Sequence, residues 1–225
     1  MQHNNLPFEK MKEVPTTIAC LKRVLLCYQR GYTVWIGFET DLEKVQAKAD
    51  QWKEQFGTSL LPYQRQDKKQ RRLPTAVATC SRVLGKPYTR ELILMATPFA
   101  LDAPPMSPWA TQKWVTRPPE CGPFVMVHAP RVRGDYAWTW KLQNAEMQRL
   151  SNRLTTLVKT RDAHAVRSET AAWVEIFPMF RGVRNQFKRM LWSGEKLWTA
   201  CNASSWPGAD HDNLPIIGRF HKESQ

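Results

Sequence analysis

The placement of proline limits the fold of this chain more than any other feature of its sequence. Seven of its sixteen prolines lie between Pro98 and Pro123. Proline fixes φ, lacks a backbone donor and disfavours the α region in the residue before it, so this stretch cannot form a long helix or strand. A loop of that length is usually a functional segment or a linker. We predict an N-terminal α+β part over residues 1–97, a Pro-rich connection over 98–123 and a hairpin with helices over 124–225, unless all three form one continuous domain.

The N-terminal part carries the pattern of a β-α unit. Residues 16–30 have apolar positions at helical spacing, and residues 32–38 are rich in the aromatic and β-branched side chains that favour a strand. Thr40 and Glu43 have the spacing of a capping box, and an apolar stripe follows them, which predicts a helix over 41–56. Gly57 is placed to end that helix.

Two hairpins and a C-terminal helical block are predicted for the rest of the chain. Alternation and turn residues predict four further strands, over 75–83, 90–97, 124–132 and 136–142. Helical spacing predicts three helices, one capped by Asn144, one over 168–177 and one over 179–192. The predicted fold class is therefore α+β, with a small mixed or antiparallel sheet that contains a β-α unit and two hairpins, followed by the helical block.

The charge of the chain points to a polyanionic partner. Its 33 Lys and Arg residues against 20 Asp and Glu give a formal net charge of +13. The densest basic run, 65–72, is predicted to lie on a loop after Pro62. Such a run can contact a polyanion, or it can be a solvated loop without a binding role. Further cations recur inside segments predicted to be folded, which is the usual footprint of a nucleic-acid-binding protein. The predicted nucleic-acid contacts are Lys68, Lys69, Arg71, Arg72, Arg131, Arg133, Arg181, Arg184, Lys188, Arg189 and Trp192.

The last predicted helix combines cations with an apolar stripe. Arg181, Arg184 and Lys188 follow one another at three- and four-residue spacing. A polyanion can lie along such a flank, but long cationic side chains also cover the edges of apolar cores. Gly182 lies within this helix, where glycine is unfavourable, and we expect a backbone or a phosphate to approach it closely.

The second hairpin carries basic residues at its turn. Arg131 and Arg133 flank the turn, and a planar guanidinium can both bind phosphate and stack on a base. His128 alternates onto the side of the apolar residues before it, so we expect it to be partly buried. The second strand places four residues on one face, which we predict to be core: Tyr136, Trp138, Trp140 and Leu142.

Catalysis is a second hypothesis. Metal-free RNA cleavage uses the ribose 2′-hydroxyl as nucleophile, a His or Tyr as acid or base, and cations that stabilise the charged transition state. The candidate catalytic residues of such a metal-independent endoribonuclease are His128, Tyr136, Arg131 and Arg133. In size, charge and mixed strand–helix content the chain is similar to small basic α+β proteins that process CRISPR repeat RNA, although it lacks their Gly-rich C-terminal loop.

Several other classes of site are not expected. The acidic residues are scattered and the five histidines form no pair, so we predict no metal ligands. Ten dispersed glycines form no phosphate-binding fingerprint, so neither ATP nor another cofactor is expected. Five widely spaced cysteines favour reduced thiols. No stretch is long and apolar enough to span a bilayer and no signal peptide is evident, so we expect a cytoplasmic protein without a membrane partner.

The tryptophan content leaves a third hypothesis. Ten Trp residues in this chain must lie in a core or on a contact surface. A Trp-rich surface could bind other protein subunits, as in an assembly subunit of a larger nucleoprotein complex. Our first expectation is a basic nucleic-acid-binding protein of a bacterial or mobile-element system, which contacts the phosphates of DNA or RNA through distributed Arg and Lys and is not an enzyme.

Overall fold

The chain divides between Pro119 and Glu120 into two compact units. The computed structural model describes residues 13–14, 17–83, 86–131, 134–202 and 204–217. The division falls inside the predicted Pro-rich connection, so residues 98–119 belong to the first unit.

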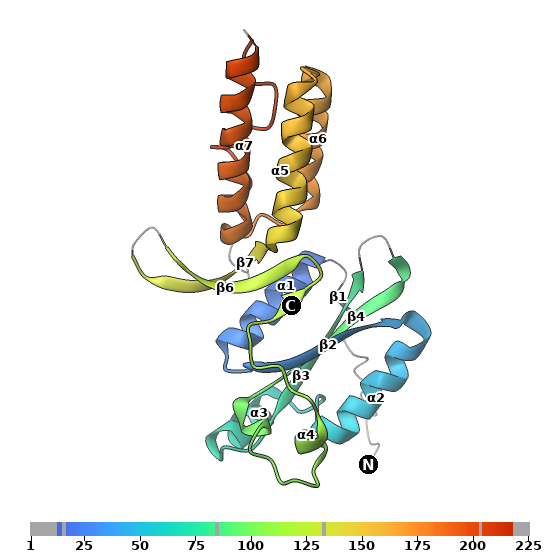
Figure 1. The fold of residues 1–225 in the computed structure, drawn as a ribbon. Coiled ribbons are helices and arrows are strands. Elements are labelled where there is room, and N and C mark those ends of the chain that lie inside the picture. Colours follow the sequence, from blue (N-terminus) through green and yellow to red (C-terminus); the bar gives the residue numbers. More distant parts are fainter. Residues whose placement is uncertain (1–12, 15–16, 84–85, 132–133, 203, 218–225) are drawn as a thin grey trace, which may run out of the picture. The chain divides into compact units, whose positions relative to one another are not determined.

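The first unit is built on a four-stranded mixed sheet with the strand order β1-β3-β4-β2 (Figure 1). β1 is parallel to β3, and β4 pairs antiparallel with both β3 and β2. β3 and β4 form the first predicted hairpin. The bounds of the strands are Glu13–Val14 for β1, Val34–Asp41 for β2, Ala76–Val83 for β3 and Lys86–Ala96 for β4.

Helices pack against β3 and β4 from two directions. On one face, Trp52 and Phe56 of α2 (Val45–Phe56) form a buried cluster with Leu92 and Leu94. Ile93 and Met95 alternate with these leucines and are also buried, so β4 has apolar contacts on both faces. On the other face, α1 (Thr17–Gln29) contacts β3 and β4. Burial on both faces explains why β4 has a continuous apolar run.

The start of α2 differs from the prediction. β2 continues through Thr40 to Asp41, a short 3₁₀ helix η1 (Leu42–Lys44) follows, and neither helix has a side-chain cap. The predicted capping box is therefore wrong, because Thr40 pairs with Arg90 in the sheet instead. The predicted end is confirmed: Gly57 adopts a left-handed conformation with φ 63°.

The basic run is helical, so the predicted loop over 65–72 is wrong. α3 spans Pro62–Gln70, with proline in its first turn, and the Leu61 N–H donates to the side chain of Gln64 over 2.8 Å. Proline is favoured at that position because its missing N–H would have no helical partner there. The helix ends before Arg72, which takes a positive φ of 56°.

The Pro-rich stretch forms only short elements, as predicted, but it packs into the first unit. Its elements are η2 (Pro98–Ala100) and α4 (Pro108–Thr111). Trp109 and Trp114 stack with ring centroids 6.0 Å apart and both contact Phe56. The Trp35 indole N–H donates to the Arg117 carbonyl over 2.9 Å. Tryptophan contacts therefore hold this segment in place.

The second unit contains a three-stranded antiparallel sheet followed by three helices. The strands are β5 (Glu120–Cys121), β6 (Phe124–Pro130) and β7 (Tyr136–Leu142), in that order across the sheet. The helices are α5 (Asn144–Lys159), α6 (Ala163–Ile176) and α7 (Arg181–Cys201). The three helices lie side by side, and the β6–β7 hairpin crosses the end at which α7 begins (Figure 1). The predicted α+β class, with two hairpins and a C-terminal helical block, is confirmed.

The helix ends in this unit differ in detail from the prediction. Asn144 is the first residue of α5, not its cap, and Gln143 precedes it without a side-chain cap. α6 begins earlier than predicted because the Asp162 side chain accepts a hydrogen bond from the Ala165 N–H over 2.9 Å. α7 continues to Cys201, far beyond the predicted end at residue 192.

The segment after α7 folds back over the helices, and Trp206 anchors it there. Its indole packs edge-on against Trp198, with ring centroids 6.4 Å apart. The Ala209 N–H donates to the Thr170 hydroxyl of α6 over 2.9 Å. Leu214 is buried, whereas Ile216 is 74% exposed, so the packing of this segment ends near Leu214.

Candidate nucleic-acid interface

The β6–β7 hairpin has a buried base and an exposed tip. Two cross-strand pairs at the base are buried, Phe124 with Leu142 and Met126 with Trp140. Beyond them, His128 lies opposite Trp138 and is exposed. The predicted burial of His128 is therefore wrong, and only the Trp140–Leu142 half of the predicted aromatic face is core. The four residues share one face of β7 as predicted, but the buried core does not extend along that face to the tip of the hairpin.

The exposed part of the hairpin brings together most of the residues that were predicted for it. The His128 imidazole lies 5.5 Å from the Tyr136 ring and 4.9 Å from the Trp138 ring, at interplanar angles of 40° and 34°. Arg131 pairs with Asp135 over 3.0 Å where the strands end. Arg133 lies outside the described residues. We refer to His128, Arg131, Tyr136 and Trp138 as the hairpin tip.

Arg181 joins α7 to the hairpin. Its Nη2 donates to the carbonyls of Ala129 and Ala137, over 2.8 and 2.9 Å, which lie opposite each other on β6 and β7. Burial lowers the pKa of Arg181, repulsion from Arg131 lowers it further, and Asp135 opposes the shift. The guanidinium thus binds backbone carbonyls of the protein itself, and we assign it a structural role.

Two neighbours of Arg181 fix the approach of α7 to β7. A side chain at Gly182 would meet the carbonyl oxygen of Trp140, so only glycine allows this contact. The expected close approach is therefore that of a backbone. One turn later, Gln186 accepts from the Leu142 N–H over 2.8 Å and donates to the Leu142 carbonyl over 3.0 Å. The start of α7 is thus firmly placed beside the hairpin.

A row of four side chains continues along α7, each one turn from the next. We call Arg184, Lys188, Trp192 and Lys196 the α7 row; it spans about 18 Å at 1.5 Å per residue. The exposed Arg189 lies beside it. Arg184 and Arg189 have no ion-pair partner among the described residues, whereas Lys188 pairs with Asp212 over 2.6 Å. The prediction missed Lys196 because it ended the helix at residue 192.

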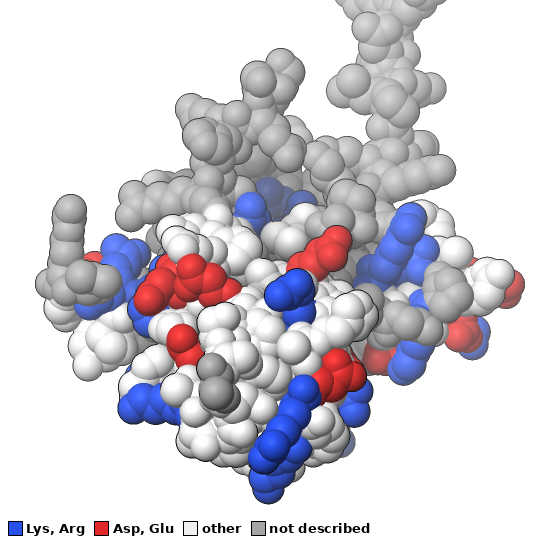
Figure 2. Space-filling view, turned by 90° about the horizontal axis from the view of Figure 1, so that it is seen from above, with Lys and Arg blue, Asp and Glu red and all other residues white. Residues whose placement is uncertain are grey.

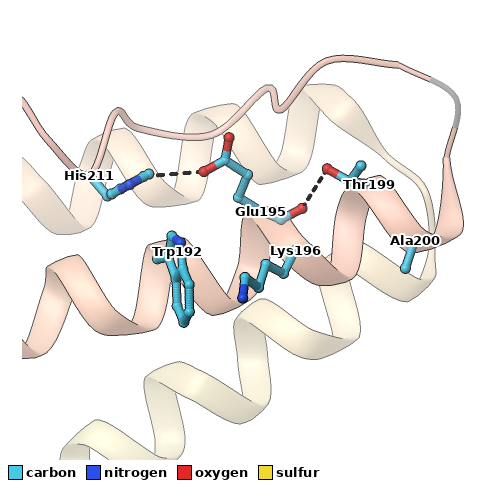
Figure 3. A pocket seen from close by; sticks show the side chains of 6 residues that line it. All are labelled: Trp192, Glu195, Lys196, Thr199, Ala200 and His211. Carbon is cyan, nitrogen blue, oxygen red and sulfur yellow. Dashed lines mark hydrogen bonds and ion pairs between the residues drawn. The ribbon is translucent and has the colours of Figure 1, made fainter.

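An open hollow of about 560 Å³ lies at the far end of the α7 row (Figure 3). Its floor and rim come from the last turns of α7 and from the segment that folds back over it. Trp192 is 47% exposed, and the Lys196 ammonium lies 3.7 Å from the centroid of its indole ring. The residues that line the hollow are Trp192, Glu195, Lys196, Thr199, Ala200 and His211.

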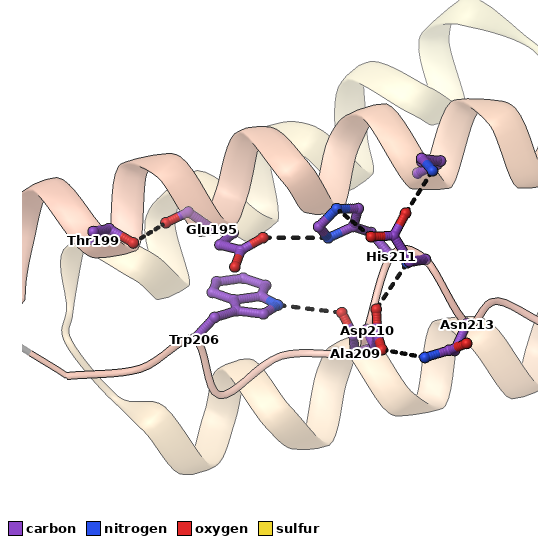
Figure 4. Close-up of polar contacts among 9 residues, drawn as sticks. Glu195, Thr199, Trp206, Ala209, Asp210, His211 and Asn213 are labelled. Atoms are coloured by element: carbon purple, nitrogen blue, oxygen red, sulfur yellow. Dashed lines mark hydrogen bonds and ion pairs between the residues drawn. The ribbon is translucent and has the colours of Figure 1, made fainter.

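A chain of polar contacts fixes one side of this hollow (Figure 4). His211 Nδ1 lies 3.2 Å from the Glu195 carboxylate, and its Nε2 lies 3.5 Å from that of Asp212. The hydrogen bond from Lys188 lowers the pKa of Asp212. Asp210 accepts from the Asp212 N–H over 2.8 Å, which holds this turn in shape. Neither Glu195 nor His211 was predicted as a site residue, because their proximity depends on the backward fold of the chain.

The basic residues of α3 are used partly within the first unit. The Lys69 ammonium donates to the Arg30 carbonyl over 2.7 Å and lies 3.8 Å from the centroid of the Tyr32 ring. Burial lowers its pKa. Arg71 pairs with Asp67 over 3.2 Å, Lys68 is half-buried and Arg72 is exposed. Of the four predicted nucleic-acid contacts on this run, Lys69 is the one whose charged group makes the most contacts within the protein.

The predicted cations are divided between the two units. Those of α3 belong to the first unit, and those of the hairpin and α7 belong to the second. In the view of Figure 2, Lys and Arg side chains lie singly or in small groups, with Asp and Glu between them. In the second unit, cations, aromatic rings and an open hollow lie on neighbouring elements.

The described residues contain no group of three or more His, Cys, Asp or Glu side chains placed to hold a metal ion. In the same part of the chain, no helix is long and apolar enough to cross a membrane. No family model, curated protein or solved structure matches this chain.

Proposed function

We propose that this protein binds nucleic acid, DNA or RNA, chiefly through its second unit and catalyses no reaction on it. The observation that carries the proposal is the α7 row together with Arg189. Arg184 and Arg189 have no acidic partner among the described residues, whereas Arg149 and Arg153 on α5 pair with Glu146 and Glu169. Cations left without acidic partners favour phosphate, because counterions are released when it binds.

The hairpin tip supports the same proposal from a different kind of chemistry. The exposed rings of His128 and Tyr136, with the half-buried Trp138 beside them, can stack on bases, and Arg131 can contact phosphate. The hydrogen bonds of Arg181 link this tip to the start of α7, so the hairpin tip and the α7 row are held next to each other. We omit Arg181 and Lys69 from the direct contacts. Of the predicted residues, Lys68, Arg71 and Arg72 remain proposed phosphate contacts of the first unit.

The proposal is tested by measuring affinity against salt for single-stranded, duplex and hairpin nucleic acids. The double variant Arg184→Gln/Arg189→Gln should lower the slope of log affinity against log salt by about 1.5, since each lost phosphate contact contributes about 0.7 to 0.9. Glutamine retains part of the aliphatic stem that packs on the helix.

A matched control removes the same charge elsewhere in the unit. Lys159→Gln/Arg167→Gln changes exposed cations of α5 and α6, and should leave the slope unchanged. If the control lowers the slope as much as the α7 variant, net charge and not the α7 row determines binding. If the unaltered protein shows no steep fall in affinity with salt for any nucleic acid, the proposal is wrong.

One observation favours a second candidate function, a metal-independent endoribonuclease. His128 and Tyr136, the candidate acid–base pair, are neighbours at an exposed tip that also holds Arg131. Incubation with structured RNA in EDTA should then give products with 2′,3′-cyclic phosphates. His128→Ala and Tyr136→Phe should abolish them while the salt slope stays unchanged. Intact RNA after incubation with the unaltered protein would leave binding as the function.

The Trp-rich assembly surface has weaker support. Five of the ten tryptophans are buried within their own unit: Trp35, Trp52, Trp140, Trp173 and Trp198. Core packing therefore explains half of the tryptophan content without a surface that binds other subunits. Trp192 is the most exposed of those that remain.

A further inference from the structure

Trp192 is placed unlike the other tryptophans of the helical block. Trp198, which follows Trp192 by six residues on α7, is buried and packs against Trp206, whereas Trp192 is 47% exposed and faces the hollow. Large aromatic surface is costly to leave in water, so an exposed indole beside a hollow indicates a contact with a ligand or partner. The proposed phosphate contacts of Arg184 and Arg189 do not use it.

The Trp192 ring already attracts a surface cation. The Lys196 ammonium lies 3.7 Å from the ring centroid, and Lys196 is an exposed, flexible side chain. An exposed cation–π contact is weak, and stacking of a base on an aromatic ring is stronger. A base can therefore displace the ammonium from the ring, which leaves Lys196 beside the phosphate of the same nucleotide.

The rim of the hollow supplies polar groups that are held in place. Glu195 is fixed by His211, whose side chain is only 17% exposed, and His211 is supported in turn by Asp212 (Figures 3 and 4). A carboxylate has several acceptor positions, so Glu195 can accept from the N–H groups on the edge of a base while it retains its contact with His211. The Trp192 ring, the Lys196 ammonium and the Glu195 carboxylate can thus contact the face of a base, its phosphate and the edge of the base, respectively.

We propose that this hollow is a base-binding subsite for single-stranded nucleic acid, with one base stacked on Trp192 and the strand running along the α7 row. This inference rests on the proposed function and adds the class of nucleic acid. A base in a duplex must leave its stack and its partner before it can enter a protein pocket, whereas a base in a single strand is free to do so. Phosphates along the row contact Arg184 and Lys188.

The test compares two substitutions that differ in the aromatic ring alone. Trp192→Phe keeps a stacking face, and Trp192→Leu keeps an apolar side chain without one. Binding to a fluorescein-labelled 20-nucleotide single strand and to the duplex of the same sequence is measured by fluorescence anisotropy. Trp192→Leu should weaken single-strand binding roughly 5- to 100-fold, the effect of one lost base stack, and Trp192→Phe less than about threefold. Duplex binding should change less than about twofold in both variants.

A matched control separates stacking from exposed apolar surface. Ile176→Ala removes an exposed apolar side chain of α6, which is 56% exposed and lies outside the hollow, and it should leave both affinities unchanged. Equal single-strand affinities for Trp192→Leu and the unaltered protein would overturn the subsite while the proposed function stands. Equal losses for single strand and duplex would also overturn it. Failure of the proposed function is recognised separately, because the unaltered protein would then show no salt-dependent binding.

Discussion

Gly182→Ala tests the packing of α7 on the hairpin, because two physical effects of this substitution have opposite signs. In a helix interior, alanine is more favourable than glycine by about 1 kcal/mol. At this position, however, the added methyl group would meet the Trp140 carbonyl oxygen as well as side-chain atoms of Lys141 and Thr139. A backbone carbonyl in a sheet cannot move aside without displacing its strand.

The net effect is expected to be destabilising. Overpacking costs typically 1 to 3 kcal/mol, and a contact with backbone lies at the upper end of that range. The shift also stretches the hydrogen bond from the Gly182 N–H to the Thr139 hydroxyl, which is 3.2 Å long and contributes about 1 kcal/mol. Against these losses of about 3 to 4 kcal/mol stands the gain of about 1 kcal/mol in helix propensity. We expect the unit to lose about 2 to 3 kcal/mol of unfolding free energy.

The assay is urea unfolding of the full chain, followed by far-ultraviolet circular dichroism. The control is Ser193→Ala at an exposed position of the same helix, where propensity alone acts and stability should rise by up to about 0.5 kcal/mol. A Gly182→Ala protein as stable as the unaltered one, or more stable, would refute the close packing of α7 on β7.

Three further predictions concern stability and accessibility. Burial raises the pKa of Cys20 from 9.0 to about 11. Between pH 9 and 11 the thiol therefore stays neutral in the folded protein but ionises in the unfolded chain, and up to about 2 to 3 kcal/mol of unfolding free energy should be lost over this range. Urea unfolding should show a smaller loss in Cys20→Ala. Lys69→Ala should reduce stability by about 1 kcal/mol, since a hydrogen bond and a cation–π contact are lost, and should leave the salt slope of nucleic-acid binding unchanged; a lower slope would return Lys69 to the phosphate contacts. A thiol-specific reagent should modify Cys27 and Cys201 before Cys20, Cys80 and Cys121 in the native protein, and rapid labelling of all five thiols would contradict the burial of those three.

Local patterns were enough to predict most elements, and the exceptions have identifiable causes. The bounds of β7 match the prediction because strict alternation and a clear turn define that strand. α3 was missed because its polar sequence has no apolar stripe, although Pro62 at its start is a helix signal. The capping box at Thr40 failed because pairing along β4 extends β2 past that residue. Tertiary pairing outweighed a local signal there.

The candidate site was predictable where it lies within one element and not where it depends on packing. The basic positions of α7 and the residues of the hairpin tip follow from spacing and alternation. The internal role of Arg181 and the hollow around Trp192 depend on which segments meet, as when His211 reaches Glu195. Burial at the tip was mispredicted for His128 because alternation indicates a face but not how far along it a core extends.

The contact between Gln186 and Leu142 covers part of the open edge of β7. β7 is the last strand of its sheet, and an open strand edge invites pairing with a strand of another chain. The Gln186 amide accepts from one backbone group of Leu142 and donates to the other, as a neighbouring strand would. A single side chain thus occupies both backbone groups of Leu142, and a strand of another chain would have to displace Gln186 to pair with β7 at this position.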